Sequence, residues 1–160
     1  MRFAEEVRYL VLAAQLEGRR QLARQLRPLG LTPSQAEVLR VLADYAPLTL
    51  NGLGQLLVCE SGSSPSRLVD RMVTRDLVER QPSATDGRQV ELTLTPAGSA
   101  LATRVAEVEN VMYAAIDAAA THDASDGLDF LRAFVSGSPA GDALSRRQER
   151  DTSPVEGGKS

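Results

Sequence analysis

Three hydroxyl-proline dipeptides constrain the fold of this chain more than any other feature of its sequence. They are Thr32-Pro33, Ser64-Pro65 and Thr95-Pro96, and each precedes a run of apolar residues at helical spacing. A Ser or Thr side chain caps a helix by accepting a hydrogen bond from its first turn, and proline suits the first helical position because an N–H there has no partner. Each dipeptide therefore predicts where a helix begins, and the three together predict a mainly helical chain.

Apolar residues that recur every three or four positions predict the remaining helices. A long amphipathic helix runs from Phe3 until Pro28, and Gln35 completes a capping box in the helix that ends near Tyr45. The later stretches predict a short helix over 50–57, a helix over 65–75, a helix from 96 to about 120 and a last helix capped by Ser125. A tight turn at residues 60–63 joins the short helix to its successor, which makes the two a helix-turn-helix candidate.

Two apolar and β-branched segments separated by turn residues predict a β-hairpin. Residues 77–80 and 90–94 are typical of strands, and the segment between them, 82–87, is rich in turn-forming residues. The order of elements is thus helix, helix, helix-turn-helix, hairpin, long helix and helix. It predicts a fold that is mainly α with a small β-hairpin wing, a winged helix-turn-helix held between outer helices.

The chain after Gly137 differs in composition from what precedes it. Gly, Ser, Pro and charged residues dominate, and only Leu144 and Val155 are sizeable apolar side chains. Because so little surface can be buried to offset the entropy of ordering, we expect residues 137–160 to form a disordered tail.

Composition excludes several classes of function. One cysteine, Cys59, and one histidine, His122, rule out an intrachain disulfide framework and a Cys/His zinc site. The sequence has no glycine-rich phosphate loop, no nucleophile with a histidine base and no cluster of metal ligands, so we expect no enzyme activity, no cofactor and no metal. No apolar run approaches the ~18 residues of a membrane span, and charges replace the apolar run of a signal peptide, which indicates a cytoplasmic protein without a membrane partner.

Four motifs occur in fixed order between Leu53 and Leu101. They are S-R-L-V-D-R-M at 66–72, D-L-V-E-R at 76–80, D-G-R at 86–88 and L-T-P-A-G at 94–98. In this combination the chain closely resembles the MarR family of bacterial transcriptional regulators, and with the flanking helices the resemblance covers roughly residues 3–136. The resemblance implies a helical dimerisation region over 1–31 and 96–136 and a winged helix-turn-helix DNA-binding domain over 32–95.

The helix after the turn is the candidate recognition helix. An isolated helix in the major groove presents its first turn to base edges and phosphates. Short hydroxyls and two arginines four residues apart lie there, and the candidate DNA contacts are Ser63, Ser64, Ser66, Arg67 and Arg71. The alternative is that the serines only cap the helix and that the arginines form local ion pairs with Asp70. Because the net charge is -3, from 18 Lys and Arg against 21 Asp and Glu, contact with nucleic acid must come from such local placement.

The hairpin carries the second candidate site. Asp86-Gly87-Arg88 resembles the family motif in which the aspartate orients the arginine into the minor groove. An arginine on a narrow hairpin tip favours A·T-rich minor grooves because their negative potential is enhanced. We therefore take Asp86 and Arg88 as DNA-binding residues of the wing, against the alternative of an ordinary loop charge. Two features depart from the family: residues 57–64 are about one residue longer than usual, and Gly87 replaces a residue that is often basic.

The outer helices predict a dimer. One helix-turn-helix covers only a few base pairs, so specific reading normally needs two half-sites and a two-fold dimer. In the resembled family the terminal helices pair, and here their apolar faces carry Phe3, Val7, Leu10, Leu128, Leu131 and Phe134. We therefore expect a homodimer on a pseudo-palindromic operator in double-stranded DNA.

The resemblance also implies a regulatory input. Similar regulators respond to small, often aromatic ligands or to oxidation of a cysteine, and either input changes the separation of the two recognition helices. We expect a repressor that a small-molecule effector releases from its operator. One alternative is a thiol-oxidation sensor acting through Cys59, although the adjacent Glu60 disfavours a reactive thiolate. The other is a winged helix used as a protein-interaction module without specific DNA binding.

Overall fold

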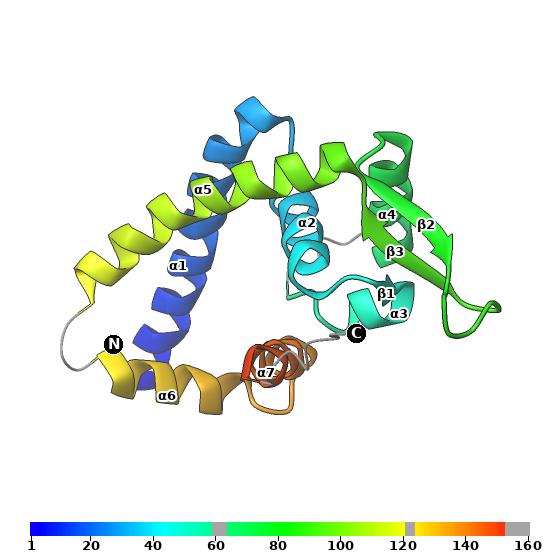
Figure 1. Cartoon of the computed structure of the whole chain (residues 1–160). Helices are drawn as coiled ribbons and strands as arrows, with labels where there is room; N and C mark the ends of the chain where they lie inside the picture. The colour runs from blue at the N-terminus through cyan, green and yellow to red at the C-terminus, as the bar shows by residue number, and fades with distance from the viewer. Residues whose placement is uncertain (59–63, 121–123, 153–160) are drawn as a thin grey trace.

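The structure is a computed structural model of the chain, and it describes residues 1–58, 64–120 and 124–152. Its elements in chain order are α1 (Phe3–Leu26), the 3-10 helix η1 (Arg27–Leu29), α2 (Pro33–Tyr45), β1 (Leu48–Thr49), α3 (Leu50–Gly54), α4 (Pro65–Thr74), β2 (Val78–Pro82), β3 (Val90–Leu94), α5 (Pro96–Ala119), α6 (Ala124–Val135) and α7 (Pro139–Thr152). The predicted fold class is confirmed, because the described chain is mainly helical and has a small antiparallel sheet (Figure 1).

Side-chain caps begin the helices at the predicted places. The Thr32 hydroxyl accepts a hydrogen bond from the backbone N–H of Gln35 at 3.3 Å, and the Gln35 side chain accepts one from the Thr32 N–H at 3.0 Å. Thr95 likewise accepts from the N–H of Gly98 at 3.0 Å and starts α5. The expected cap at Ser125 is wrong, because α6 begins at Ala124 and Ser125 lies inside its first turn.

The sheet contains the predicted hairpin and one further strand. In β2 and β3, Val78 pairs with Leu94 and Pro82 pairs with Val90. The unpredicted strand β1 pairs with β3 and has only two residues, too few to show an alternating pattern in the sequence. The third helix is shorter than predicted and ends at Gly54, since its two glycines weaken it.

The core lies where α2, α4, the sheet and the first half of α5 meet. Leu39, Met72 and Val105 are fully buried there. The start of α5 approaches the chain before β2 so closely that a Cβ atom on Gly98 would lie 1.9 Å from the backbone oxygen of Leu77. This packing makes the winged helix a firm support for α4 and the hairpin.

The outer helices α1, α6 and the second half of α5 extend away from the winged helix (Figure 1). Large apolar side chains stay exposed on them, among them Phe3, Leu10, Val111, Ile116, Leu128, Leu131 and Phe134. In the described ranges, no helix is long and apolar enough to cross a membrane. The chain therefore leaves an apolar surface on its outer helices that it does not cover itself.

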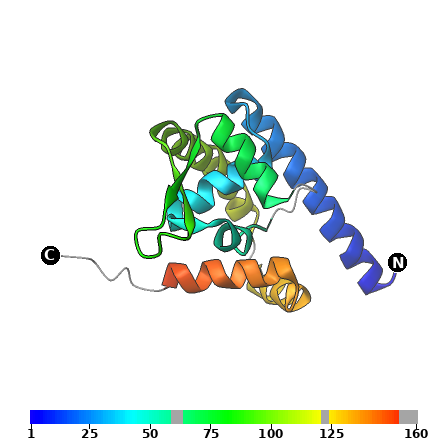
Figure 2. The same ribbon diagram turned by 90° about the vertical axis from the view of Figure 1, so that its right-hand side faces the viewer.

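Residues 139–152 form helix α7, which corrects the expectation of a disordered tail for this part of the chain. Gly141 and Ala143 are buried at its start, and a Cβ atom on Gly141 would lie 2.2 Å from the backbone oxygen of Val135 in α6. Further along, polar side chains of α7 bond to the winged helix, beside which α7 lies (Figures 1 and 2). The low apolar content of this segment wrongly predicted disorder, because buried small residues and hydrogen bonds from arginines hold α7 against the rest of the chain. Residues 153–160 lie outside the described residues.

Candidate nucleic-acid interface

Helix α4 presents a polar face opposite a buried one. It begins at Pro65 because the Ser64 hydroxyl accepts a hydrogen bond from the Arg67 N–H at 3.5 Å. Leu68, Val69 and Met72 are buried against the core, whereas Arg67 and Arg71 are exposed and Ser66 is half-buried. The spacing of four residues thus places both arginines on the exposed face, and Ser66 lies in the first turn.

The structure shows no local ion pair between the exposed arginines of α4 and any other residue that it describes. Among the described residues, neither Arg67 nor Arg71 lies within ion-pair distance of a carboxylate. Asp70, the expected partner, instead accepts a hydrogen bond from Arg80 of β2 at 2.6 Å. That bond ties α4 to the hairpin and leaves both guanidinium groups available to an outside partner.

The hairpin turn is organised by Ser83, a residue that sequence reasoning assigned only to the turn. Ser83 as a residue is 7% exposed, and its hydroxyl donates to Glu91 at 2.7 Å and accepts from the backbone N–H of Asp86 at 3.3 Å. Its own N–H donates to the Gln89 carbonyl at 2.8 Å. A serine three residues before an aspartate in a turn is the sequence signal for such hydroxyl-to-backbone bonding.

Asp86 acts on the backbone of Arg88 and not on its side chain. One carboxylate oxygen accepts from the Arg88 N–H at 3.1 Å, and the other accepts from the Gln89 side-chain amide at 3.1 Å. In the part of the chain that the structure describes, no ion pair joins Asp86 to the Arg88 guanidinium, and the Arg88 side chain is exposed. Asp86 therefore fixes the conformation of the turn that carries Arg88.

The recognition-helix residues and the wing residues come from separate elements on one side of the molecule. α4 and the β2–β3 hairpin both lie at the end of the molecule opposite α1 and α6 (Figure 1), and the view onto that end shows them side by side (Figure 2). The candidates Ser63 and Cys59 lie outside the described residues. Within the described residues, no group of three or more His, Cys, Asp or Glu side chains is placed to hold a metal ion.

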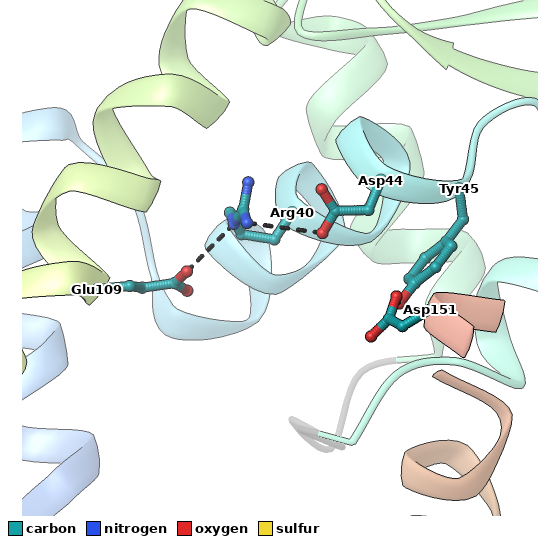
Figure 3. Close-up of polar contacts among 5 residues, drawn as sticks. All are labelled: Arg40, Asp44, Tyr45, Glu109 and Asp151. Atoms are coloured by element: carbon teal, nitrogen blue, oxygen red, sulfur yellow. Dashed lines mark hydrogen bonds and ion pairs between the residues drawn. The ribbon is translucent and has the colours of Figure 1, made fainter. Parts of the chain in front are cut away.

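A polar joint connects this end of the molecule to the outer helices. Arg40 of α2 donates to Glu109 of α5 at 3.2 Å and lies 3.6 Å from Asp44 (Figure 3). Burial raises the pKa of Glu109 above its ordinary value, and Arg40 opposes that rise. Tyr45, at the end of α2, donates to Asp151 of α7 at 2.7 Å (Figure 3); burial first and this hydrogen bond second raise the pKa of Tyr45 to about 12.

Comparison with known proteins gives one match to a family model and matches to several solved structures. A model described as MarR family matches residues 29–89. A variant of MarR from E. coli complexed with operator DNA is 26% identical, with 85% of this chain and 99% of that chain covered and a TM-score of 0.69. A probable transcriptional regulator from Pseudomonas aeruginosa is 24% identical, with 84% and 99% covered and a TM-score of 0.68. The MepR–DNA complex from S. aureus is 19% identical, with 81% and 96% covered and a TM-score of 0.71. No curated protein matches the chain.

Proposed function

We propose that the chain is a winged-helix DNA-binding transcription regulator of the MarR family and acts as a homodimeric repressor of a specific operator. Ser64, Ser66, Arg67 and Arg71 contact the major groove, together with Ser63, and Arg88 enters the adjacent minor groove on a turn that Asp86 fixes. A small-molecule effector releases the protein from the operator.

The observation that carries the proposal is the placement of exposed arginines on α4 and on the wing at one end of the molecule. Arg67 and Arg71 form no ion pair among the described residues, and Arg88 is exposed on a turn braced by Asp86. Arginine has a rigid fork of donors that suits guanine edges and phosphates. A chain with a net charge of -3 has no general attraction for DNA, so this local cluster supplies the attraction.

The homodimer is supported by the apolar side chains left exposed on the outer helices. Phe3 is 75% exposed, Leu10 62% and Phe134 63%, which is unusual for side chains of this size on a surface without a partner. Phe3 also lies edge-on to Phe130 of α6 with ring centres 6.4 Å apart, so α1 and α6 share one apolar surface. A second copy covers this surface and sets the spacing of the two recognition helices.

Effector control is supported by the joint between α2 and α5. The contact of Arg40 with Glu109 joins the winged helix to an outer helix, so a ligand that changes it also changes the separation of the two DNA-binding ends. Oxidation of Cys59 remains the alternative input, and a winged helix that binds a protein partner is the alternative function. The acidic net charge supports the protein-binding alternative, because it gives the chain no overall attraction for DNA.

The test is selection of duplexes from a random DNA pool by the purified protein at two salt concentrations. Arg88→Ala is run beside the wild type, with Arg24→Ala as the control, because Arg24 is an exposed arginine that belongs to α1 and not to α4 or the wing. We expect an inverted repeat with half-sites about one helical turn apart. Arg88→Ala lowers affinity for it by about tenfold or more, and the control leaves it unchanged.

Two other outcomes overturn the proposal. If neither protein enriches a motif under reducing conditions, specific DNA reading is absent and the protein-interaction alternative gains support. If a motif is enriched but Arg88→Ala binds it as well as Arg24→Ala does, the wing takes no part in recognition and the assignment of Arg88 is wrong.

A further inference from the structure

Helix α7 donates hydrogen bonds to the residues that directly follow α3. The Nε–H of Arg147 donates to the backbone oxygen of Leu56 at 2.7 Å, and Arg146 donates to the backbone oxygen of Gln55 at 3.2 Å. These two carbonyls follow directly on α3, where helix carbonyls lose their internal partners. Two arginines that are 91 residues away in sequence therefore supply donors to this helix end.

Arg147 also binds a carboxylate that holds the next part of the same segment. Its guanidinium donates to Oε1 of Glu37 at 2.5 Å, and the same oxygen accepts the backbone N–H of Val58 at 2.8 Å. The Glu37 side chain is 10% exposed and that of Arg147 is 26% exposed, so the pair is shielded from water. Arg147 thus contacts Leu56 directly and Val58 through Glu37, and it spans the short stretch between them.

A second contact, one turn further along α7, fixes how the helix lies. The Tyr45 hydroxyl donates to Asp151 at 2.7 Å, and the Arg150 guanidinium lies 5.6 Å from the centre of the Tyr45 ring. Together with the buried Gly141 at the start of α7, this contact holds the helix at both ends. Arg147 lies between the two and has its register set by them.

We propose that Arg147 is a positioning residue for the helix-turn-helix: by bonding Leu56 and Glu37 it fixes the path of residues 56–58 and thereby the angle at which α4 is presented. The effect on DNA recognition rests on the proposed function, whereas the effect on residues 56–58 does not. The planar fork of arginine reaches both acceptors at once, and lysine, with one point charge, satisfies one of them at a time. The C-terminal helix is then a working part of the DNA-reading unit.

The experiment compares full-length wild type with Arg147→Ala, Arg147→Lys and the control Arg24→Ala. Without DNA, hydrogen exchange of peptides from residues 52–58 and from the buried face of α4 is followed. We expect exchange at the Val58 amide to rise about tenfold in Arg147→Ala, with Arg147→Lys in between and the core of α4 unchanged.

With DNA, affinity is measured for the operator that the wild type selects and for a scrambled duplex. A positioning role predicts that Arg147→Ala loses about tenfold on the operator and less than about twofold on the scrambled duplex. A simple charge contribution predicts equal losses on both, as does contact of Arg147 with phosphate. Equal losses, or unchanged exchange at Val58, overturn the proposal.

Two further controls keep the outcomes separate. If Arg147→Ala fails to fold, Asp151→Asn and Tyr45→Phe loosen α7 without removing the partner of Glu37, and they must shift Val58 exchange in the same direction by a smaller factor; no shift overturns the proposal. If the wild type selects no operator, the proposed function fails, and the exchange measurement alone decides whether Arg147 fixes residues 56–58.

Discussion

Asp86 shows at the residue scale how a carboxylate can serve DNA binding without touching DNA. It carries a negative charge toward a polyanion, yet its two oxygens hold the backbone of Arg88 and the side chain of Gln89. The first bond needs only an acceptor, and an asparagine oxygen supplies one. Asparagine therefore keeps the bond to the Arg88 N–H and loses only the charge and the acceptor for the Gln89 amide.

We predict that Asp86→Ala weakens operator binding by about threefold to tenfold and that Asp86→Asn leaves it the same or slightly tighter. The reason is that alanine frees the turn, whereas asparagine keeps the acceptor and removes a repulsive charge. Fluorescence anisotropy with a labelled operator measures both. Equal weakening by the two variants would show that the charge, through the arginine side chain, is what matters.

Glu109 is the residue whose titration is most informative about the joint between α2 and α5. Its pKa is raised first by burial, and the nearby Arg40 lowers it by less than burial raises it. The folded chain therefore binds a proton at Glu109 more readily than the unfolded chain does. Its contribution to stability is full below the ordinary pKa of 4.5 and is lost as pH rises through the raised value.

Glu109→Gln should accordingly gain stability relative to wild type as pH rises from about 4.5 toward neutrality. Urea unfolding at a series of pH values measures the difference between the two proteins. If the wild type instead gains stability relative to the variant over this pH range, the ion pair with Arg40 lowers the pKa of Glu109 by more than burial raises it. Arg40→Ala serves as the companion variant, because removing the cation raises the pKa of Glu109 further and extends the window upward.

At the scale of elements, the sequence was most informative where a structure depends on neighbours in the chain. The caps at Thr32 and Thr95 and the exposed arginine face of α4 follow from spacings of three and four residues, and the structure has them there. Helix α7 and strand β1 depend on distant partners, such as the contact of Arg147 with Leu56, which no local pattern encodes. The roles of Ser83 and of Arg80 were missed because their partners become visible only once the hairpin is folded.

The junction of α5 with the chain before β2 gives a prediction at this scale. A Cβ atom on Gly98 would lie 1.9 Å from the Leu77 backbone oxygen, so Gly98→Ala must separate two backbone segments. We expect a loss of about 1–3 kcal/mol in the free energy of unfolding. Gly127→Ala in α6 is the matched control: its Cβ meets nothing within 4 Å, and it should be neutral or stabilising by up to about 1 kcal/mol. Equal effects in chemical denaturation would refute the close-contact explanation.

At the scale of the whole molecule, the chain has one part with a buried apolar core and another part whose large apolar side chains stay exposed. The winged helix has a closed core, in which Leu39, Leu42 and Met72 are among the fully buried side chains. Helix α6 has no buried residue among its described positions, although Leu128, Leu131 and Phe134 lie along it. A helix of this kind gains its stability from packing against another surface, and the proposed homodimer supplies one.

A charge placed on α6 should therefore separate the copies. We predict that Phe134→Asp raises the dimer dissociation constant at least tenfold, because a two-fold interface meets each substitution twice and must bury both carboxylates. Sedimentation equilibrium gives this constant. Val90→Asp is the matched control: Val90 is an exposed apolar residue of β3, remote from α6, and its replacement should leave the constant unchanged.

The Phe134→Asp monomer should still bind a single half-site weakly, since α4 and the wing are supported by the closed core, but should lose the added affinity of the inverted repeat. A variant that stays dimeric would place the interface elsewhere, and a variant that loses half-site binding as well would show that the winged helix is not independent of the outer helices.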